Sequence, residues 1–363
     1  MKPLELYLHI PFCISKCKYC DFLSAPATLK ERQDYVESLC RDIRSYRDLS
    51  KAYVVVSIFI GGGTPSILSP EQIKDIFKSI KEIFELSKDA EITIEMNPGT
   101  VDREKLSAYR EAGINRLSIG LQTADNEELK KLGRIHTYED FLETYKMARQ
   151  EGFANINVDL MSAIPGQTLA SYENTLRVVA KLSPEHISAY SLIIEEGTPF
   201  YERYGQGEHE EELPGEEEER RMYQRTKELL LEYGYERYEI SNYAKKGYAC
   251  RHNLGYWERA EYLGIGTGAS SLLNNQRWVQ GEKKETIDRQ GQMEEFMFLG
   301  LRKIEGISRT VFESTFGCPV EHIYGDVILR MKENGLMKDA DGYLRLTEKG
   351  IDLSNYVMRE FLL

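Results

Sequence analysis

The sequence predicts an α/β fold: a partial (βα)6 barrel followed by a smaller, mostly helical C-terminal region that resembles a winged helix. Three observations support this prediction. Six strand-like segments occur in order, helical patterns fill the gaps between them, and the alternation stops after the sixth. Such alternation indicates parallel βαβ units, and six of them fit part of an eight-unit barrel better than an open sheet. We expect the two parts to cover residues 1–234 and 235–363.

The six strands show the two hydrophobic patterns typical of strands. Apolar and polar residues alternate over 4–10, which is the period of a half-buried strand. The segment "VVVSIFI" at 54–60 is rich in β-branched residues and ends at a glycine, as buried strands do. The remaining predicted strands are 91–96, 116–121, 155–161 and 186–194.

Capping signals mark two of the intervening helices. Ser69 and Gln72 predict a capping box, with a proline at the first helical position. Thr137 and Asp140 predict a second helix start, and Gly152 marks the end of that helix.

The pattern changes after the sixth strand. An acidic run at 207–221 predicts a solvated loop that enters a helix. Glycine- and tyrosine-rich segments begin near residue 235. Residues 293–363 read as helices with a short hairpin at "KDADGYLRLTEKG". Helices and a hairpin suggest a winged helix, but no basic recognition face accompanies them, which argues against DNA binding.

Composition narrows the class of protein. The net charge is −12, and an acidic surface repels nucleic acid and anionic lipid. No apolar run reaches the ~18 residues of a membrane span, and the start lacks the features of a signal peptide. We therefore expect a cytoplasmic protein with no nucleic-acid partner and no integral membrane span. Its six cysteines do not read as a disulfide framework.

Three of these cysteines lie within one short segment. Cys13, Cys17 and Cys20 have the spacing C-x3-C-x2-C directly after the first strand. A structural zinc site needs four ligands, and the one conceivable fourth ligand, His9, belongs to the strand. A four-iron cluster held by three cysteines keeps one iron open for chemistry. The spacing favours such a cluster, with zinc and structural thiols as alternatives.

Polar groups follow successive strands. Glycine-rich "GGGTP" at 61–65 allows close backbone approach to a ligand, and no Gly-Lys follows to make a phosphate-binding loop. Glu95, Gln122, Arg134 and Asp159 come at or near the ends of strands three to five. The carboxyl ends of barrel strands meet at one face, and buried charges need partners. A zwitterionic ligand would supply them.

The C-x3-C-x2-C motif after a first strand resembles the radical S-adenosylmethionine (SAM) superfamily, whose fold is a full or partial α/β barrel. Further segments resemble its HemN/HemW group over essentially the whole chain: "YLHIPFCISKCKYCDF", "IFIGGGTPS", "IEMNPGT", "RLSIGLQT", "LGRIHT", "NVDLMSAIPGQT" and "HNLGYWERAEYLGIGTGA". The resemblance implies that Cys13, Cys17 and Cys20 bind a [4Fe-4S] cluster. It also implies SAM contacts by Tyr7, Tyr19, Gly62, Gly63, Thr64, Glu95, Gln122, Arg134 and Asp159.

Two departures distinguish the branches of this group. The oxygen-independent coproporphyrinogen III dehydrogenase carries another cysteine two residues after the last cluster ligand, where this chain has Phe22. The dehydrogenase also has a sizeable segment ahead of the cluster strand, which here begins near Leu4. Both differences favour the HemW-type haem chaperone.

The segment "CRHNLGYW" favours the same branch. His252, Asn253, Tyr256 and Trp257 form an H-N-x-x-Y-W motif, which the resemblance connects with haem. A histidine nitrogen can ligate haem iron and aromatic rings can pack on a porphyrin. A role for the thiolate of Cys250 is an alternative with less support. The glycine-rich segment 262–269 predicts a tight turn at the barrel mouth.

The leading hypothesis is therefore a haem chaperone that binds one haem as cargo and passes it to an acceptor protein, such as a respiratory enzyme. The alternative is radical oxidative decarboxylation of coproporphyrinogen III to protoporphyrinogen IX, with cleavage of SAM. A winged-helix regulator that senses iron or haem is a third, weaker reading. The first two readings require an electron donor, and a homodimer is left open.

Overall fold

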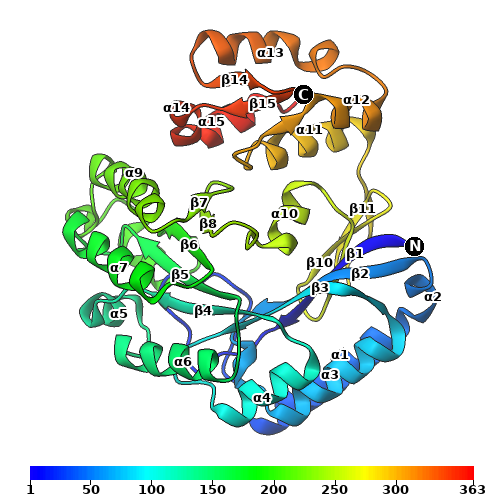
Figure 1. The fold of residues 1–363 in the computed structure, drawn as a ribbon, viewed down its shortest axis with the longest axis vertical. Helices are drawn as coiled ribbons and strands as arrows, with labels where there is room; N and C mark the ends of the chain where they lie inside the picture. Colours follow the sequence, from blue (N-terminus) through cyan, green and yellow to red (C-terminus); the bar gives the residue numbers. More distant parts are fainter.

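The computed structural model describes residues 1–363 and has the predicted partial barrel (Figure 1). Six parallel strands follow one another in chain order. They are β1 (Lys2–Ile10), β2 (Tyr53–Gly62), β3 (Glu85–Met96), β4 (Arg116–Gln122), β5 (Ile156–Ser162) and β6 (His186–Ser191). The larger helices of this part are α1 (Leu29–Ser45), α3 (Pro70–Ile83), α4 (Arg103–Ala112), α6 (Tyr138–Gln150), α7 (Leu169–Leu182) and α9 (Glu216–Glu232), and they cover the outside of the sheet. The short segments are α2 (Arg47–Ser50), η1 (Pro65–Ile67), α5 (Asn126–Leu132), α8 (Pro199–Tyr204) and η2 (Glu210–Glu212).

Local signals place these helices as predicted. The Ser69 hydroxyl accepts the N–H of Gln72, and the Thr137 hydroxyl accepts that of Asp140, each within a complete capping box. The acidic run forms the loop that contains η2 and the first turn of α9. Four glutamates lie in that turn, where the positive end of the helix dipole favours them.

The sixth strand is shorter than predicted. It ends at Ser191, not at residue 194, because the chain leaves the sheet for a turn at Gly197, which has a left-handed φ of 83°. Leu192 and Ile194 instead pack against a small separate cluster that contains Met161 and Phe200, whereas Ile193 is exposed.

The two faces of the parallel strands differ sharply. Along β1, Leu4, Leu6 and Leu8 are fully buried in a core of 53 residues shared with the outer helices. The side chains that alternate with such core residues point to the inner face of the barrel, and on all six strands many of them are polar and buried. These are Glu5, His9, Ser57, Glu91, Thr93, Arg116, Ser118, Asn157 and His186. The barrel interior is therefore polar rather than filled with apolar side chains.

The sheet continues beyond the six predicted strands. β8 (Asn242–Ala244) runs antiparallel to β6 and pairs with β7 (Glu236–Arg237). β9 (Tyr262–Ile265) runs parallel to β1 on the other side, followed by β10 (Ser270–Leu273), β11 (Gln276–Val279) and β12 (Glu285–Thr286). The predicted turn at 262–269 is thus a strand in its first half. The four-residue segment, interrupted by Gly264, is too short to show a strand period.

Helix α10 (Arg251–Trp257) lies across the amino end of the barrel interior, in the opening between the two flanks of the sheet (Figure 1). The Glu91 carboxylate on β3 accepts the N–H groups of Arg251 and His252, each at 3.2 Å. A Cβ atom at Gly255 would overlap the carboxylate of Glu5, so only glycine allows this close approach.

The C-terminal part has its own core of 18 buried residues, which run from Met293 to Phe361. Its helices are α11 (Arg289–Gly300), α12 (Arg309–Phe316), α13 (Glu321–Glu333), α14 (Glu348–Asp352) and α15 (Ser354–Arg359), beside a sheet of β13 (Ile307–Ser308), β15 (Tyr343–Leu346) and β14 (Met337–Ala340). The predicted hairpin is confirmed, with Asp341 and Gly342 both at positive φ in its two-residue turn. The division at residue 234 stays a prediction, since strands up to residue 286 join the barrel sheet.

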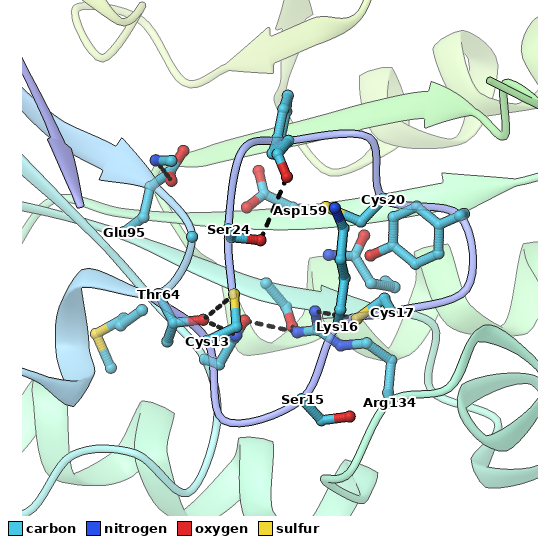
Figure 2. Close-up of a pocket in the computed structure, with 18 of the residues that line it drawn as sticks. Cys13, Ser15, Lys16, Cys17, Cys20, Ser24, Thr64, Glu95, Arg134 and Asp159 are labelled. Carbon is cyan, nitrogen blue, oxygen red and sulfur yellow. Dashed lines mark hydrogen bonds between the residues drawn. The ribbon is translucent and has the colours of Figure 1, made fainter. Parts of the chain in front are cut away.

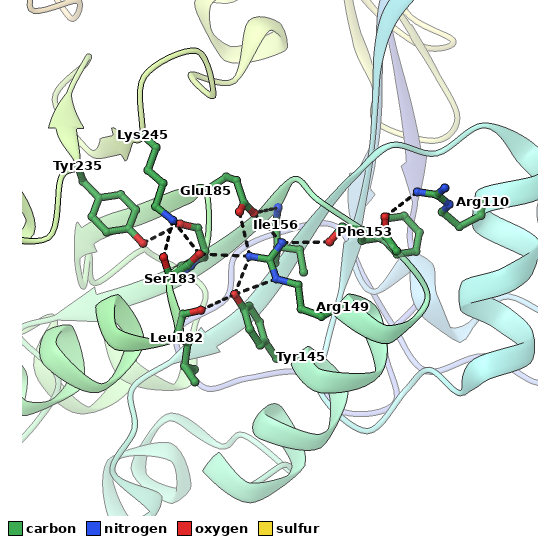
Figure 3. A network of polar contacts seen from close by, with 12 residues as sticks. Arg110, Tyr145, Arg149, Phe153, Ile156, Leu182, Ser183, Glu185, Tyr235 and Lys245 are labelled. Carbon is green, nitrogen blue, oxygen red and sulfur yellow. Dashed lines mark hydrogen bonds and ion pairs between the residues drawn. The ribbon is translucent and has the colours of Figure 1, made fainter.

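A polar network joins several segments at the amino ends of β5 and β6 (Figure 3). Glu185 accepts the backbone N–H of Ile156 at 3.0 Å and pairs with Arg149 of α6 at 2.8 Å. Lys245, which follows β8, donates to the carbonyl of Ser183 at 2.9 Å. This network fixes the strand starts on the face opposite the carboxyl ends, where a stabilising role is expected.

No helix in the structure combines the length and the apolar composition needed to cross a membrane.

The junction of β9 and β10 can be tested by substitution. A Cβ atom at Gly264 would overlap the carbonyl oxygen of Ser270, whereas Gly325, within α13, has open space and no left-handed φ. We expect Gly264→Ala to lower the free energy of unfolding by roughly 1–3 kcal/mol, as overpacking does. Urea denaturation measures the change, with Gly325→Ala as the control, which should not lower the free energy of unfolding. Equal stability of the two variants would contradict the close approach of these strands.

Candidate functional site

A cavity of about 280 Å³ opens at the carboxyl ends of the barrel strands, and all three clustered cysteines line it (Figure 2). The predicted SAM residues Tyr19, Gly62, Gly63, Thr64, Glu95, Gln122, Arg134 and Asp159 also line it. The ends of four strands, the loop after β1 and, for Arg134, the segment after α5 therefore bring these side chains to one place. Tyr7 is the exception among the predicted set, since it lies in a neighbouring cavity described below.

The cysteine loop, residues 11–24, runs between β1 and α1 and is held by backbone hydrogen bonds. Cys13 donates its N–H to the carbonyl of Ala25 at 3.1 Å. Lys18 donates to the carbonyl of Leu132 at 3.0 Å, at the end of α5. Gly63 packs under the loop, where a Cβ atom would lie 2.5 Å from the Phe12 carbonyl oxygen. The glycine-rich segment after β2 is thus needed to seat the loop.

Polar donors approach two of the sulfur atoms. The Thr64 hydroxyl lies 3.4 Å from the Sγ of Cys13, and the Arg134 guanidinium lies 3.5 Å from the Sγ of Cys17. All three cysteines are half-buried free thiols. His9, the conceivable fourth ligand, uses both ring nitrogens elsewhere, on the Tyr7 hydroxyl and the carbonyl of Leu23. Three thiols without a fourth protein ligand fit a cluster with one open iron.

Two buried carboxyl groups face the same cavity. Glu95 accepts the N–H of Gly62 at 3.1 Å, and burial, reinforced by the nearby Asp159, raises its pKa to about 8. Burial also raises the pKa of Asp159, although Asn157 and Ser118 donate hydrogen bonds to it at 2.7 and 3.3 Å. Both groups would be more stable as carboxylates beside a bound cation.

A guanidinium and an amide complete the polar wall. Arg134 donates to the side chain of Asn97 at 2.7 Å and to the carbonyl of Gly120. Gln122 ends β4 in a left-handed conformation, with a φ of 77°, and accepts the hydroxyl of Tyr190 at 2.9 Å. A non-glycine residue in this conformation is uncommon and often accompanies a functional site.

Sequence reasoning missed several residues that line the cavity. Asn97 connects Thr64 with Arg134, and Tyr190 orients Gln122. Ser118 and Gly120 lie on the inner face of β4. The alternation of side chains along a strand could have identified three of them. Ser118 and Gly120 lie on the same face of β4 as Gln122, and Tyr190 lies on the same face of β6 as the buried His186.

A second, larger cavity of about 580 Å³ lies beside the first. Its aromatic lining residues are Tyr7, Phe22, Tyr256, Trp257 and Tyr262. Arg259 and Arg277 also line it. Phe22, on the cysteine loop, lines both cavities, so the two sites are neighbours.

The H-N-x-x-Y-W motif divides between this cavity and the barrel interior. Tyr256 and Trp257 line the cavity, whereas Asn253 lines neither cavity. His252 is only 1% exposed, and its ring nitrogens contact the hydroxyls of Ser57 at 2.8 Å and Tyr256 at 3.2 Å. Burial lowers the pKa of His252 to about 3, so the ring is neutral.

The thiol of Cys250 also points away from the cavities. It is fully buried and donates to Glu91 at 3.4 Å. In this conformation neither His252 nor Cys250 has an atom free for a ligand in the aromatic cavity.

Comparison with known proteins agrees with this architecture. The model of the radical SAM superfamily matches residues 7–179, and that of the HemN C-terminal domain matches residues 287–353. A solved structure of coproporphyrinogen III oxidase (HemN) from Escherichia coli superimposes with a TM-score of 0.86, covering 99% of this chain and 90% of that chain at 23% identity. At that identity the likeness establishes the fold.

Curated relatives are more similar in sequence. The heme chaperone HemW of Bacillus subtilis is 37% identical over 98% of both chains. The heme chaperone HemW of Lactococcus lactis is 36% identical over 100% of this chain and 98% of the relative, and that of Escherichia coli is 35% identical over 100% and 99%.

The barrel and the cysteine-lined cavity, together with these matches, define a radical SAM protein, a class that implies a [4Fe-4S] cluster and SAM. Within that superfamily, the chain belongs to the family of the heme chaperone HemW.

The raised pKa of Glu95 predicts how the free energy of unfolding changes with pH. Its folded pKa is about 8 and its ordinary value is 4.5, so protonated Glu95 contributes stability that is complete below 4.5 and is lost as the pH rises to 8. Glu95→Gln should therefore be more stable than the wild type by more than ~1 kcal/mol near pH 8, and the difference should shrink toward pH 5. Urea unfolding of the metal-free proteins measures this. Glu217→Gln, on exposed α9, is the control, and a pH-independent difference for Glu95→Gln would contradict the pKa.

Proposed function

We propose that this protein is a haem chaperone of the cytoplasm: it binds haem as cargo and passes it to an acceptor protein, such as a respiratory enzyme. The observation that carries the proposal is the pairing of two adjacent cavities, one polar and lined by three thiols, the other aromatic. Free haem is apolar and redox-active, so a carrier must shield it from water and oxidants. The aromatic cavity beside the cysteine loop suits that task.

Cys13, Cys17 and Cys20 are the residues that would hold the [4Fe-4S] cluster. Thr64 and Arg134 support this assignment, because hydrogen bonds to sulfur offset the negative charge of thiolates. The cluster supplies one-electron chemistry when bound, and an electron donor is its expected partner.

The charges around the cavity support SAM as the second ligand. The ligand carries an amino group, a carboxylate and a sulfonium. Arg134 is the guanidinium available for the carboxylate, and Glu95 and Asp159 are acceptors for the cationic groups. Gly62 and Gly63 also line the cavity, and Gln122 and Tyr190 form a polar wall.

Haem itself is assigned to the aromatic cavity. Trp257, Tyr256 and Tyr262 offer ring faces and edges for a porphyrin. Tyr256 and Tyr262 pack edge to face, with ring centroids 4.7 Å apart. His252 holds the hydroxyl of Tyr256 from inside the barrel. In this assignment His252 positions the aromatic wall, and Asn253 belongs to the supporting helix.

The cluster assignment predicts a specific loss. Anaerobic reconstitution of the wild type should give about four iron atoms per chain, as one four-iron cluster requires. Cys17→Ala should fail to retain them, because two thiolates remain. Cys318→Ala, in the C-terminal part, is the control and should keep the iron. An iron-free wild type that binds one zinc tightly would overturn the assignment.

The carrier assignment predicts binding without turnover. Titration with ferric haem should produce a saturable Soret band at one haem per chain. The reduced, reconstituted protein should convert no coproporphyrinogen III to protoporphyrinogen IX in the presence of SAM. Product detection by fluorescence after oxidation measures this, and clear turnover would establish the dehydrogenase reaction instead.

A further inference from the structure

Two arginines on one wall of the aromatic cavity share a single carboxylate. Arg259 contacts one oxygen of Glu295 at 2.7 Å, and Arg277 contacts the other oxygen at 2.7 Å. Glu295, on α11, is 9% exposed, whereas the Arg277 side chain is 40% exposed. Two guanidinium groups and one carboxylate leave one uncompensated positive charge at this wall. The only other charged side chain that lines the cavity is the exposed Asp21, on the cysteine loop.

The same wall holds hydrogen-bond donors without acceptors. One terminal nitrogen of the Arg259 guanidinium is buried and has no hydrogen-bond partner. The indole N–H of Trp257 is also buried and also has none. Both residues line the cavity. A buried donor without an acceptor costs free energy, so this wall carries unsatisfied donors beside the ion pairs of Glu295.

The backbone at Arg259 is strained. Its φ is +58°, in the left-handed region that arginine seldom adopts. This conformation ends helix α10 and turns the arginine toward Glu295 and Asn275, the latter at 3.0 Å. A left-handed residue is common directly after a helix, and here it fixes the direction in which the Arg259 side chain leaves the backbone.

We propose that Arg259 and Arg277 bind the carboxylates of the cargo, so that the cavity selects a planar, apolar ring system with acidic side chains. The inference rests on the proposed function, which assigns haem to this cavity, and it adds the groups that recognise the haem propionates. Arginine suits this role because its planar donors match a carboxylate in pairs. Glu295 holds the two guanidinium groups in place and limits their charge.

The test compares ferric haem with its dimethyl ester, in which both carboxylates are blocked. We expect the wild type to bind haem at least about tenfold more tightly than the ester, as charge-assisted hydrogen bonds require. Arg277→Gln and Arg259→Gln should each lower this ratio several-fold while affinity for the ester stays near that of the wild type. Affinity for the ester thus reports whether the cavity is still folded.

Arg220→Gln is the matched control, since Arg220 lies on exposed α9 and pairs only with Glu216. Its ratio should equal that of the wild type. If the wild type binds haem and ester equally, or if the ratio survives both arginine substitutions, the inference is wrong and the haem-carrier function stands. If the wild type binds neither ligand, the haem assignment itself is wrong.

Discussion

The structure depends on one electrostatic constraint: the inner face of the barrel carries charged side chains that are removed from water and must be compensated. At the amino end, Glu91 receives the first N–H groups of α10 and lies in the field of Arg116. At the carboxyl end, Glu95 and Asp159 are raised in pKa and face a cavity. The chain itself therefore compensates Glu91, whereas Glu95 and Asp159 are left for a ligand.

This division explains why the H-N-x-x-Y-W segment has its particular residues. Its histidine and glycine fit the barrel interior, against Ser57 and Glu5. Its tyrosine and tryptophan face the aromatic cavity. One short helix thus closes the polar interior and forms part of the wall of the neighbouring site. Replacing His252 would disturb both, so loss of haem on such a change does not by itself identify an iron ligand.

Much of this arrangement could be predicted from the sequence because it depends on local signals. Strand periods, capping boxes and the cysteine spacing identified the six strands, the helix starts and the thiol loop. The segments that were not predicted depend on distant partners. β9 is a strand only because β1 lies beside it, and Tyr190 enters the site only through its place on β6. The buried position of His252 depends on its contacts with Ser57 and Glu91 on distant strands, which no residue pattern indicates.

The pairing of β9 with β1 has a consequence for how the chain can be divided. Residues 262–265 satisfy the backbone hydrogen-bonding groups along one side of Glu5–Leu8. A fragment that stopped before β9 would expose that side of β1 to solvent, next to strands rich in valine and isoleucine. Exposed, apolar strand borders of this kind recruit other chains, so such a fragment should aggregate rather than fold as an isolated barrel.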